Sequence, residues 1–217
     1  MPPAHLIETL SPLQRLALAY APASTRQPLL ALLALDTRLA GILRASREPM
    51  LAQLRFAWWR EQLAAEPGPA STGDPLLAAL NAWPAARSVL SGLVEGWEAM
   101  TGDVPLPASA FLSLAEARGA AFAALVDTPE AGAAALRMGR NWALADIASG
   151  LSNPQERAAA LELTRAQDWR WARLPRKLRP LAVLHGLAAH RIMNDAQAAH
   201  LSPATMLRAV RIGLLGR

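Results

Sequence analysis

The sequence predicts an all-α protein, and two observations carry that prediction. Its 217 residues include 48 alanines and 38 leucines but only six valines and five isoleucines. Alanine and leucine lose little conformational freedom in a helix, whereas strands favour β-branched side chains. At five places a short polar residue stands directly before a proline, which is typical of a helix start. We therefore expect a single all-α domain, a helical bundle that spans residues 1–217.

The helix starts follow from these pairs and from apolar spacing. The five pairs are Ser11-Pro12, Asp74-Pro75, Thr128-Pro129, Asn153-Pro154 and Ser202-Pro203. Together with the spacing of apolar residues they predict helices over 12–20, 27–46, 49–65, 75–83, 85–100, 107–126, 129–150, 154–168, 177–196 and 203–215. Two segments rich in Pro and Gly, 66–74 and 101–107, are expected to be loops within one domain.

Several classes of protein are excluded or disfavoured by composition. Cysteine is absent, so the chain has no disulfide, no thiolate zinc site and no cysteine nucleophile. The first ten residues have no basic segment before an apolar core, and no long apolar run is free of charged residues, Gly or Pro. We therefore expect neither a secretory signal nor a membrane span, and a cytoplasmic location.

Charge is distributed unevenly along the chain. The formal net charge is +5, but residues 1–164 carry −3 and residues 165–217 carry +8. Within the basic part, residues 168–179 interleave two tryptophans with arginines and a lysine. The asymmetry favours an anionic partner: phosphate, a lipid surface or nucleic acid. Residues 168–179 can serve cation–π contacts, a phosphate site or an anionic membrane surface, or they can be a solvated loop that anchors its tryptophans in the core.

Asp36 is the most informative polar residue. In the helix predicted over 27–46, a rotation of about 100° per residue places six apolar side chains on the same face as Asp36. They are Leu29, Leu32, Leu33, Leu39, Ala40 and Leu43. An unpaired carboxylate in that stripe would be strongly unfavourable. We expect Asp36 either to form a buried ion pair or helix cap, or to face a cavity where it binds a ligand or a metal.

Two arginines lie on the next predicted helix, 49–65. That helix has two apolar stripes, each with a tryptophan, which is typical of a helix wedged between neighbours. Arg55 and Arg60 can reach either a bound phosphate or Asp36.

A second isolated carboxylate, Asp146, lies on the helix predicted over 129–150. It shares its face mostly with small residues, so that face either packs closely or lines a cavity. The four histidines lack the spacing of a helical zinc site, and no Gly-rich phosphate loop, GxSxG or HExxH motif is present.

Several runs in the first third of the chain resemble the squalene/phytoene synthase family. They are YAPASTR at 20–26, LLALLALDTRLA at 29–40, REPM at 47–50 and RFAWWR at 55–60. The likeness is to the short alphaproteobacterial-type branch, which includes proteins similar to a mitochondrial respiratory complex I assembly factor. Looser agreement continues beyond residue 63. The resemblance implies the isoprenoid synthase bundle around a central cavity.

Active members of this family join two prenyl diphosphates head to head, with Mg²⁺ held by two aspartate-rich motifs. Here the first motif position, residues 39–43, reads LAGIL, and the second, near 149–150, reads Ser-Gly. Asp36 and Asp146 remain, each alone, and two isolated carboxylates are a poor cage for a cluster of Mg²⁺ ions. The catalytic apparatus is therefore predicted to be lost.

The resemblance and these departures predict a catalytically degenerate relative that acts as a binding or assembly-factor-type protein. Its partner would be a prenyl or other lipid-like ligand or a protein, with peripheral membrane contact through the basic C-terminal segment. No catalytic residue, metal ligand or cofactor is expected. The candidate ligand-binding residues are Tyr20, Arg26, Asp36, Arg60 and Asp146.

Two alternatives stay open. One is an active prenyl diphosphate transferase that uses Mg²⁺ with Asp36 and Asp146. The other, a basic helical nucleic-acid binder, rests only on the charge of residues 165–217.

Overall fold

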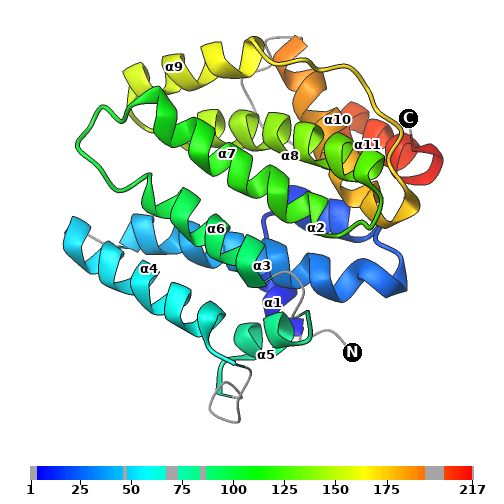
Figure 1. Cartoon of the computed structure of the whole chain (residues 1–217). Coiled ribbons are helices and arrows are strands. Elements are labelled where there is room, and N and C mark those ends of the chain that lie inside the picture. Colours follow the sequence, from blue (N-terminus) through cyan, green and yellow to red (C-terminus); the bar gives the residue numbers. More distant parts are fainter. Residues whose placement is uncertain (1–3, 46–47, 67–72, 84–86, 194–202, 217) are drawn as a thin grey trace.

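α-Helices pack into one bundle, and no strand occurs in the part of the chain that is described (Figure 1). The computed structural model describes residues 4–45, 48–66, 73–83, 87–193 and 203–216. The elements are α1 (Ala4–Thr9), α2 (Pro12–Leu18), α3 (Ala23–Ala45), α4 (Pro49–Ala64), α5 (Pro75–Asn81), α6 (Arg87–Glu98), α7 (Ala108–Ala123), α8 (Pro129–Gly150), α9 (Pro154–Arg165), the 3₁₀ turn η3 (Arg176–Leu178), α10 (Arg179–Met193) and α11 (Pro203–Leu215). The prediction of an all-α fold is confirmed.

Four of the five predicted helix starts carry the expected cap. The hydroxyl of Ser11 accepts a hydrogen bond from the backbone N–H of Gln14, and the Gln14 side chain accepts one from Ser11. The side chains of Asp74, Thr128 and Asn153 accept bonds from the first turns of α5, α8 and α9. Ser202 lies outside the described residues. These caps satisfy N–H groups that have no partner within the helix.

The main boundary error concerns α3. The prediction started this helix at residue 27, but it begins at Ala23 and contains Pro28. Backbone N–H groups of Thr25 and Arg26 bond the carbonyl of Pro22, so the first turn closes upstream of the proline. Pro28 has no N–H, so the backbone carbonyl of Ser24 lacks its hydrogen bond within the helix. Ser24 is exposed, so water can reach that carbonyl. The short helix α1 was not predicted.

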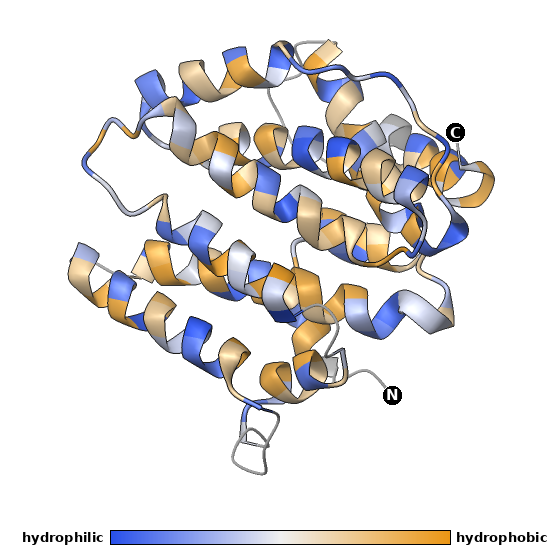
Figure 2. Cartoon of the chain, viewed as in Figure 1, coloured by the Kyte–Doolittle hydropathy of each residue, from blue (hydrophilic) through white to orange (hydrophobic). Residues whose placement is uncertain are grey.

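α3 is the central helix of the lower half in Figure 1. It contacts α1, α2, α4, α5 and α6, and residues 29–36 are buried without interruption. A helix that is apolar on all sides must be enclosed by others. The surrounding helices carry hydrophilic residues beside hydrophobic ones (Figure 2).

α7 and α8 pack closely against each other. A Cβ atom added at Gly119 would lie 2.6 Å from the backbone oxygen of Leu136, and one at Gly139 would lie 3.0 Å from the Cα of Gly119. The small-residue face predicted for α8 therefore serves close helix packing. α6 contacts α7 and so joins the two halves of the bundle.

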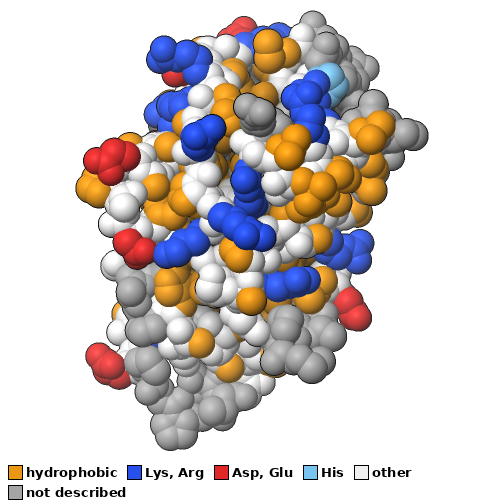
Figure 3. All heavy atoms as spheres, turned by 90° about the vertical axis from the view of Figure 1, so that its right-hand side faces the viewer, with side chains coloured by type: hydrophobic (Ala, Val, Ile, Leu, Met, Phe, Trp, Pro, Cys, Tyr) orange, Lys and Arg blue, Asp and Glu red, His pale blue; other side chains and the backbone are white. Residues whose placement is uncertain are grey.

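The C-terminal elements η3, α10 and α11 lie on the right-hand side of Figure 1. On that face basic side chains alternate with apolar ones (Figure 3). No helix within the described ranges has the length and hydropathy needed to cross a bilayer.

Candidate functional site

A buried cluster of charged side chains lies where four helices meet. Asp36, on α3, is 4% exposed. Arg118, on α7, donates from Nε to one carboxylate oxygen of Asp36 at 2.9 Å and from Nη2 to the other at 2.8 Å. Trp97, on α6, donates from its indole nitrogen to the first oxygen at 2.8 Å. Asp36 is thus the buried ion-pair partner that its apolar surroundings required, rather than a free carboxylate.

The same guanidinium binds the second predicted carboxylate. Nη1 of Arg118 donates to Asp146 on α8 at 2.9 Å. The rings of Trp97 and Trp142 lie beside the guanidinium, with centroids 5.0 and 5.3 Å from Cζ, a distance suited to cation–π attraction. Two carboxylates from helices distant in sequence therefore share one cation, which is enclosed by aromatic rings.

The electrostatics of the cluster keep Arg118 charged. Burial lowers the pKa of its guanidinium, but the attraction of Asp36 and Asp146 outweighs that effect and holds the pKa above its ordinary value. The Arg118 side chain is 5% exposed, whereas 46% of the Asp146 side chain is exposed. The cluster therefore reaches solvent only at the Asp146 end.

No group of three or more His, Asp or Glu side chains in the described ranges is arranged to hold a metal ion. At Asp36 and Asp146, a divalent cation would have to displace Arg118 or stand beside its positive charge. The contacts of Arg118 and Asp36 join α3, α6, α7 and α8.

Arg118 was missed by the sequence analysis, which considered Arg55 and Arg60 as partners of Asp36. Arg60 instead pairs with Glu98, and Arg55 is exposed. One signal could have found Arg118: it lies four residues after Leu114 and four before Phe122, both buried. An arginine inside an apolar helical stripe needs a buried acidic partner.

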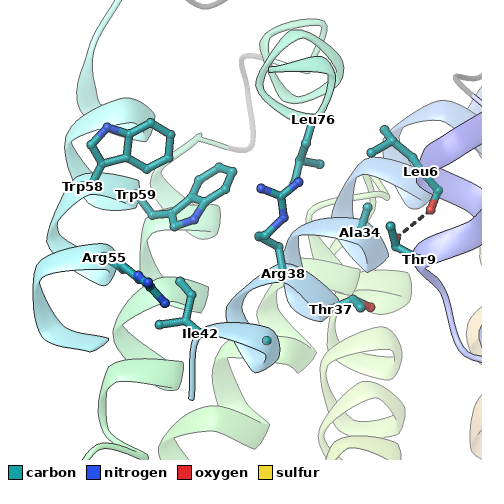
Figure 4. Close-up of a pocket in the computed structure, with 11 residues that line it drawn as sticks. Leu6, Thr9, Ala34, Thr37, Arg38, Ile42, Arg55, Trp58, Trp59 and Leu76 are labelled. Carbon is teal, nitrogen blue, oxygen red and sulfur yellow. Dashed lines mark hydrogen bonds between the residues drawn. The ribbon is translucent and has the colours of Figure 1, made fainter. Parts of the chain in front are cut away.

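A groove of about 510 Å³ opens between α1, α3, α4 and α5. Its apolar wall includes Ile42, Trp59 and Leu76, and its charged side chains are Arg38 and Arg55. Figure 4 shows the Arg38 side chain between Trp59 and Leu76. The groove thus combines aromatic and aliphatic surface with two positive charges.

None of the five predicted binding residues lines this groove. Tyr20 lies on a second hollow with Arg176 and Arg179, and its ring fills the space that a Cβ at Gly213 would need. The Nε atom of Arg26 is buried without a hydrogen-bond partner. Within the described residues, only Asp36 and Asp146 of the five are brought together, through Arg118.

The tryptophans of the basic segment surround a buried histidine. Trp169 and Trp171 have ring centroids 5.1 and 5.9 Å from that of His185, which is 0% exposed. Trp169 also donates from its indole nitrogen to the backbone oxygen of Thr164 at 2.9 Å. Burial and the nearby positive charge of Arg137 lower the pKa of His185 to about 4. The expectation that this segment anchors its tryptophans in the core is met only in part, because both rings contact buried His185 but Trp169 is half-buried and Trp171 is 39% exposed.

Comparison with known proteins finds no matching family model, no matching curated protein and no matching solved structure. The resemblance to squalene/phytoene synthases therefore rests on the motifs of the sequence.

Proposed function

We propose that the chain is a non-catalytic, squalene/phytoene synthase-like helical protein that acts by binding a lipid-like ligand. The observation that carries this proposal is the position of Arg118, which binds Asp36 and Asp146 at once. In the active enzymes of the family that the motifs resemble, carboxylates facing the central cavity serve Mg²⁺. Here the two remaining carboxylates already have a protein cation as their partner.

Mg²⁺ binding at this place would be doubly disfavoured. The ion needs several oxygen ligands in near-octahedral geometry, and two carboxylates on facing helices supply few of them. Arg118 adds a positive charge between those carboxylates, and a like charge repels the incoming ion most strongly where burial reduces solvent screening. These two effects support binding without turnover.

The groove between α1, α3, α4 and α5 is the proposed ligand site. Its volume of about 510 Å³ falls within the range usual for small-molecule sites. The apolar wall suits a hydrocarbon chain, and the guanidinium groups of Arg38 and Arg55 suit a phosphate or carboxylate head. Asp74 lies 3.6 Å from Arg38 at the groove edge, whereas Arg55 makes no ion pair within the described residues, so Arg55 is the stronger candidate for the head group.

Titration with geranylgeranyl monophosphate, followed by tryptophan fluorescence, tests the proposed site. Trp58 and Trp59 line the groove, so binding should change the emission. Arg55→Glu should weaken binding about tenfold or more, because it replaces a charge-assisted hydrogen bond by repulsion. Arg44→Glu is the matched control, since Arg44 is also exposed but lies outside the groove. Equal loss in both variants, or no binding by the wild type, would contradict the proposed site.

An assembly-type role is a second candidate, favoured by the outward face of α4. Met50, Leu54 and Trp58 lie four residues apart and are 65%, 62% and 43% exposed, so they form a continuous apolar stripe. Such stripes mark protein contacts. A protein partner that copurifies with the wild type should be lost with Leu54→Asp but retained with Arg157→Ala, which changes an exposed residue of α9.

A further inference from the structure

α11 carries an apolar surface that the bundle does not cover. Viewed down the helix, Ala209, Ile212 and Gly213 form the buried side, which packs against α10 and α2. A second arc of about 100° holds Met206, Leu207, Val210 and Leu214. Their exposed fractions are 41%, 72%, 40% and 67%. Arg211 lies at the border of this arc and is also exposed.

Arginines from the segment before α10 surround the end of this apolar arc. Leu214 lines the same hollow as Arg176 and Arg179. Leu215, which is 63% exposed, lines a neighbouring hollow with Arg173 and Arg179. Throughout the described residues, these three arginines form no salt bridge with an acidic side chain. In Figure 3 acidic side chains lie at the margins of this face, away from its centre.

We propose that this face, made of α11 and residues 173–179, docks on an anionic membrane surface. A helix that lies in the interface presents apolar side chains to the lipid and arginines to the headgroups, which is the arrangement around Leu207 and Leu214. The charge of residues 165–217, +8, complements anionic lipid. A nucleic acid would use the arginines but would leave the exposed leucines in water, so the apolar arc favours a lipid surface.

Sedimentation of the full chain with lipid vesicles tests the proposal. We expect binding to vesicles of phosphatidylglycerol with phosphatidylcholine, weakening as salt is added, and little binding to phosphatidylcholine alone. Arg176→Glu should lower the partition coefficient about fivefold or more, because each basic residue near the surface contributes about that factor. Leu214→Glu should lower it about tenfold, because an inserted leucine is replaced by a charge.

The matched control is Val104→Glu, in the loop between α6 and α7. Val104 and Leu214 are each 67% exposed, so both substitutions should leave the fold intact, which circular dichroism checks. We expect Val104→Glu to bind vesicles like the wild type.

The proposal is overturned if the wild type ignores anionic vesicles, if it binds both vesicle types equally, or if Leu214→Glu has no effect. An equal loss with Val104→Glu would also overturn it. The proposal would also be overturned if the wild type bound single-stranded RNA but not vesicles, and if Arg176→Glu abolished the RNA binding while Leu214→Glu left it unchanged.

Discussion

The guanidinium of Arg118 binds both carboxylate oxygens of Asp36, at 2.9 and 2.8 Å, in the interior of the bundle. Eighty-two residues separate the two side chains in sequence. Because both are at most 5% exposed, each neutralises a charge that water cannot reach. The pair therefore fixes α7 against α3.

Arg118→Met is expected to be strongly destabilising. The substitution keeps a long side chain but leaves the Asp36 carboxylate buried with only the Trp97 indole as partner. Breaking one side of a buried ion pair typically lowers the free energy of unfolding by about 3–5 kcal/mol. Urea unfolding followed by far-ultraviolet circular dichroism measures the change.

The double variant Arg118→Met with Asp36→Asn should be more stable than Arg118→Met alone, because the uncompensated charge is then gone. Strictly additive effects of the Arg118 and Asp36 substitutions would contradict this description of the pair.

Asp146→Asn should lower the free energy of unfolding by only about 1 kcal/mol or less, since 46% of that side chain meets water.

Gly119→Ala should separate α7 from α8. The added methyl group would lie 2.6 Å from the backbone oxygen of Leu136, which cannot move without shifting α8. Overpacking of this kind lowers the free energy of unfolding by about 1–3 kcal/mol. Gly132 lies on α8, where a new Cβ would have nothing within 4 Å. Gly132→Ala should therefore raise the free energy of unfolding by up to about 1 kcal/mol. Thermal unfolding of the two variants distinguishes these outcomes; destabilisation by both would refute the close-approach argument.

The free energy of unfolding should rise with pH between about pH 4 and 6.5 because of His185. Burial, aided by the charge of Arg137, lowers the pKa of this histidine from 6.5 to about 4 in the folded chain. Between those values the unfolded state binds the proton and the folded state does not, so acid favours unfolding. Above pH 6.5 the histidine is neutral in both states and costs no stability. On acidification to pH 4 the free energy of unfolding falls by roughly 3 kcal/mol through this group.

His185→Leu should remove that part of the pH dependence. Neither ring nitrogen of His185 makes a hydrogen bond, so leucine leaves no polar partner unpaired. Comparing unfolding free energies of the wild type and the variant at several pH values cancels the carboxylates that titrate in both. An identical pH slope for the two proteins would show that His185 titrates normally in the fold.

Asn153→Ala should weaken the start of α9. The Asn153 side chain accepts hydrogen bonds from the backbone N–H groups of Gln155 and Glu156 at 2.8 and 3.2 Å. Loss of such a cap lowers the free energy of unfolding by about 1 kcal/mol. Ser152→Ala, which changes the preceding exposed residue, should have almost no effect. Similar losses for the two variants, measured by thermal unfolding, would contradict the capping role.

The sequence predicted the fold well where local chemistry decides it. Helix starts at Pro12, Pro75, Pro129 and Pro154 follow from capping pairs whose hydrogen bonds span only two or three residues. The start of α3 was predicted four residues too late: the helix begins at Ala23, where backbone N–H groups of Thr25 and Arg26 bond the carbonyl of Pro22. A proline disfavours a helix interior in general, but burial of the run after it outweighs one lost hydrogen bond.

The site was only half predictable. The apolar stripe around Asp36 required a partner, but its identity depends on how α3 and α7 pack. The apolar stripe around Arg118 shows that this arginine needs an acidic partner, but no local pattern names Asp36 as that partner. The groove is also a tertiary feature, because α1, α3, α4 and α5 contribute its walls. Spacing along one helix can show that a carboxylate needs a cation, but it cannot choose among cations on other helices.

The most direct test of the central claim, binding without turnover, is an assay of pyrophosphate release. Purified wild-type protein is incubated with farnesyl or geranylgeranyl diphosphate, with and without Mg²⁺, after circular dichroism has shown it to be helical. Because Arg118 occupies both remaining carboxylates, we predict no release above that of a protein-free control. Mg²⁺-dependent release that Asp36→Asn abolishes would contradict the account and identify the chain as a working prenyl transferase.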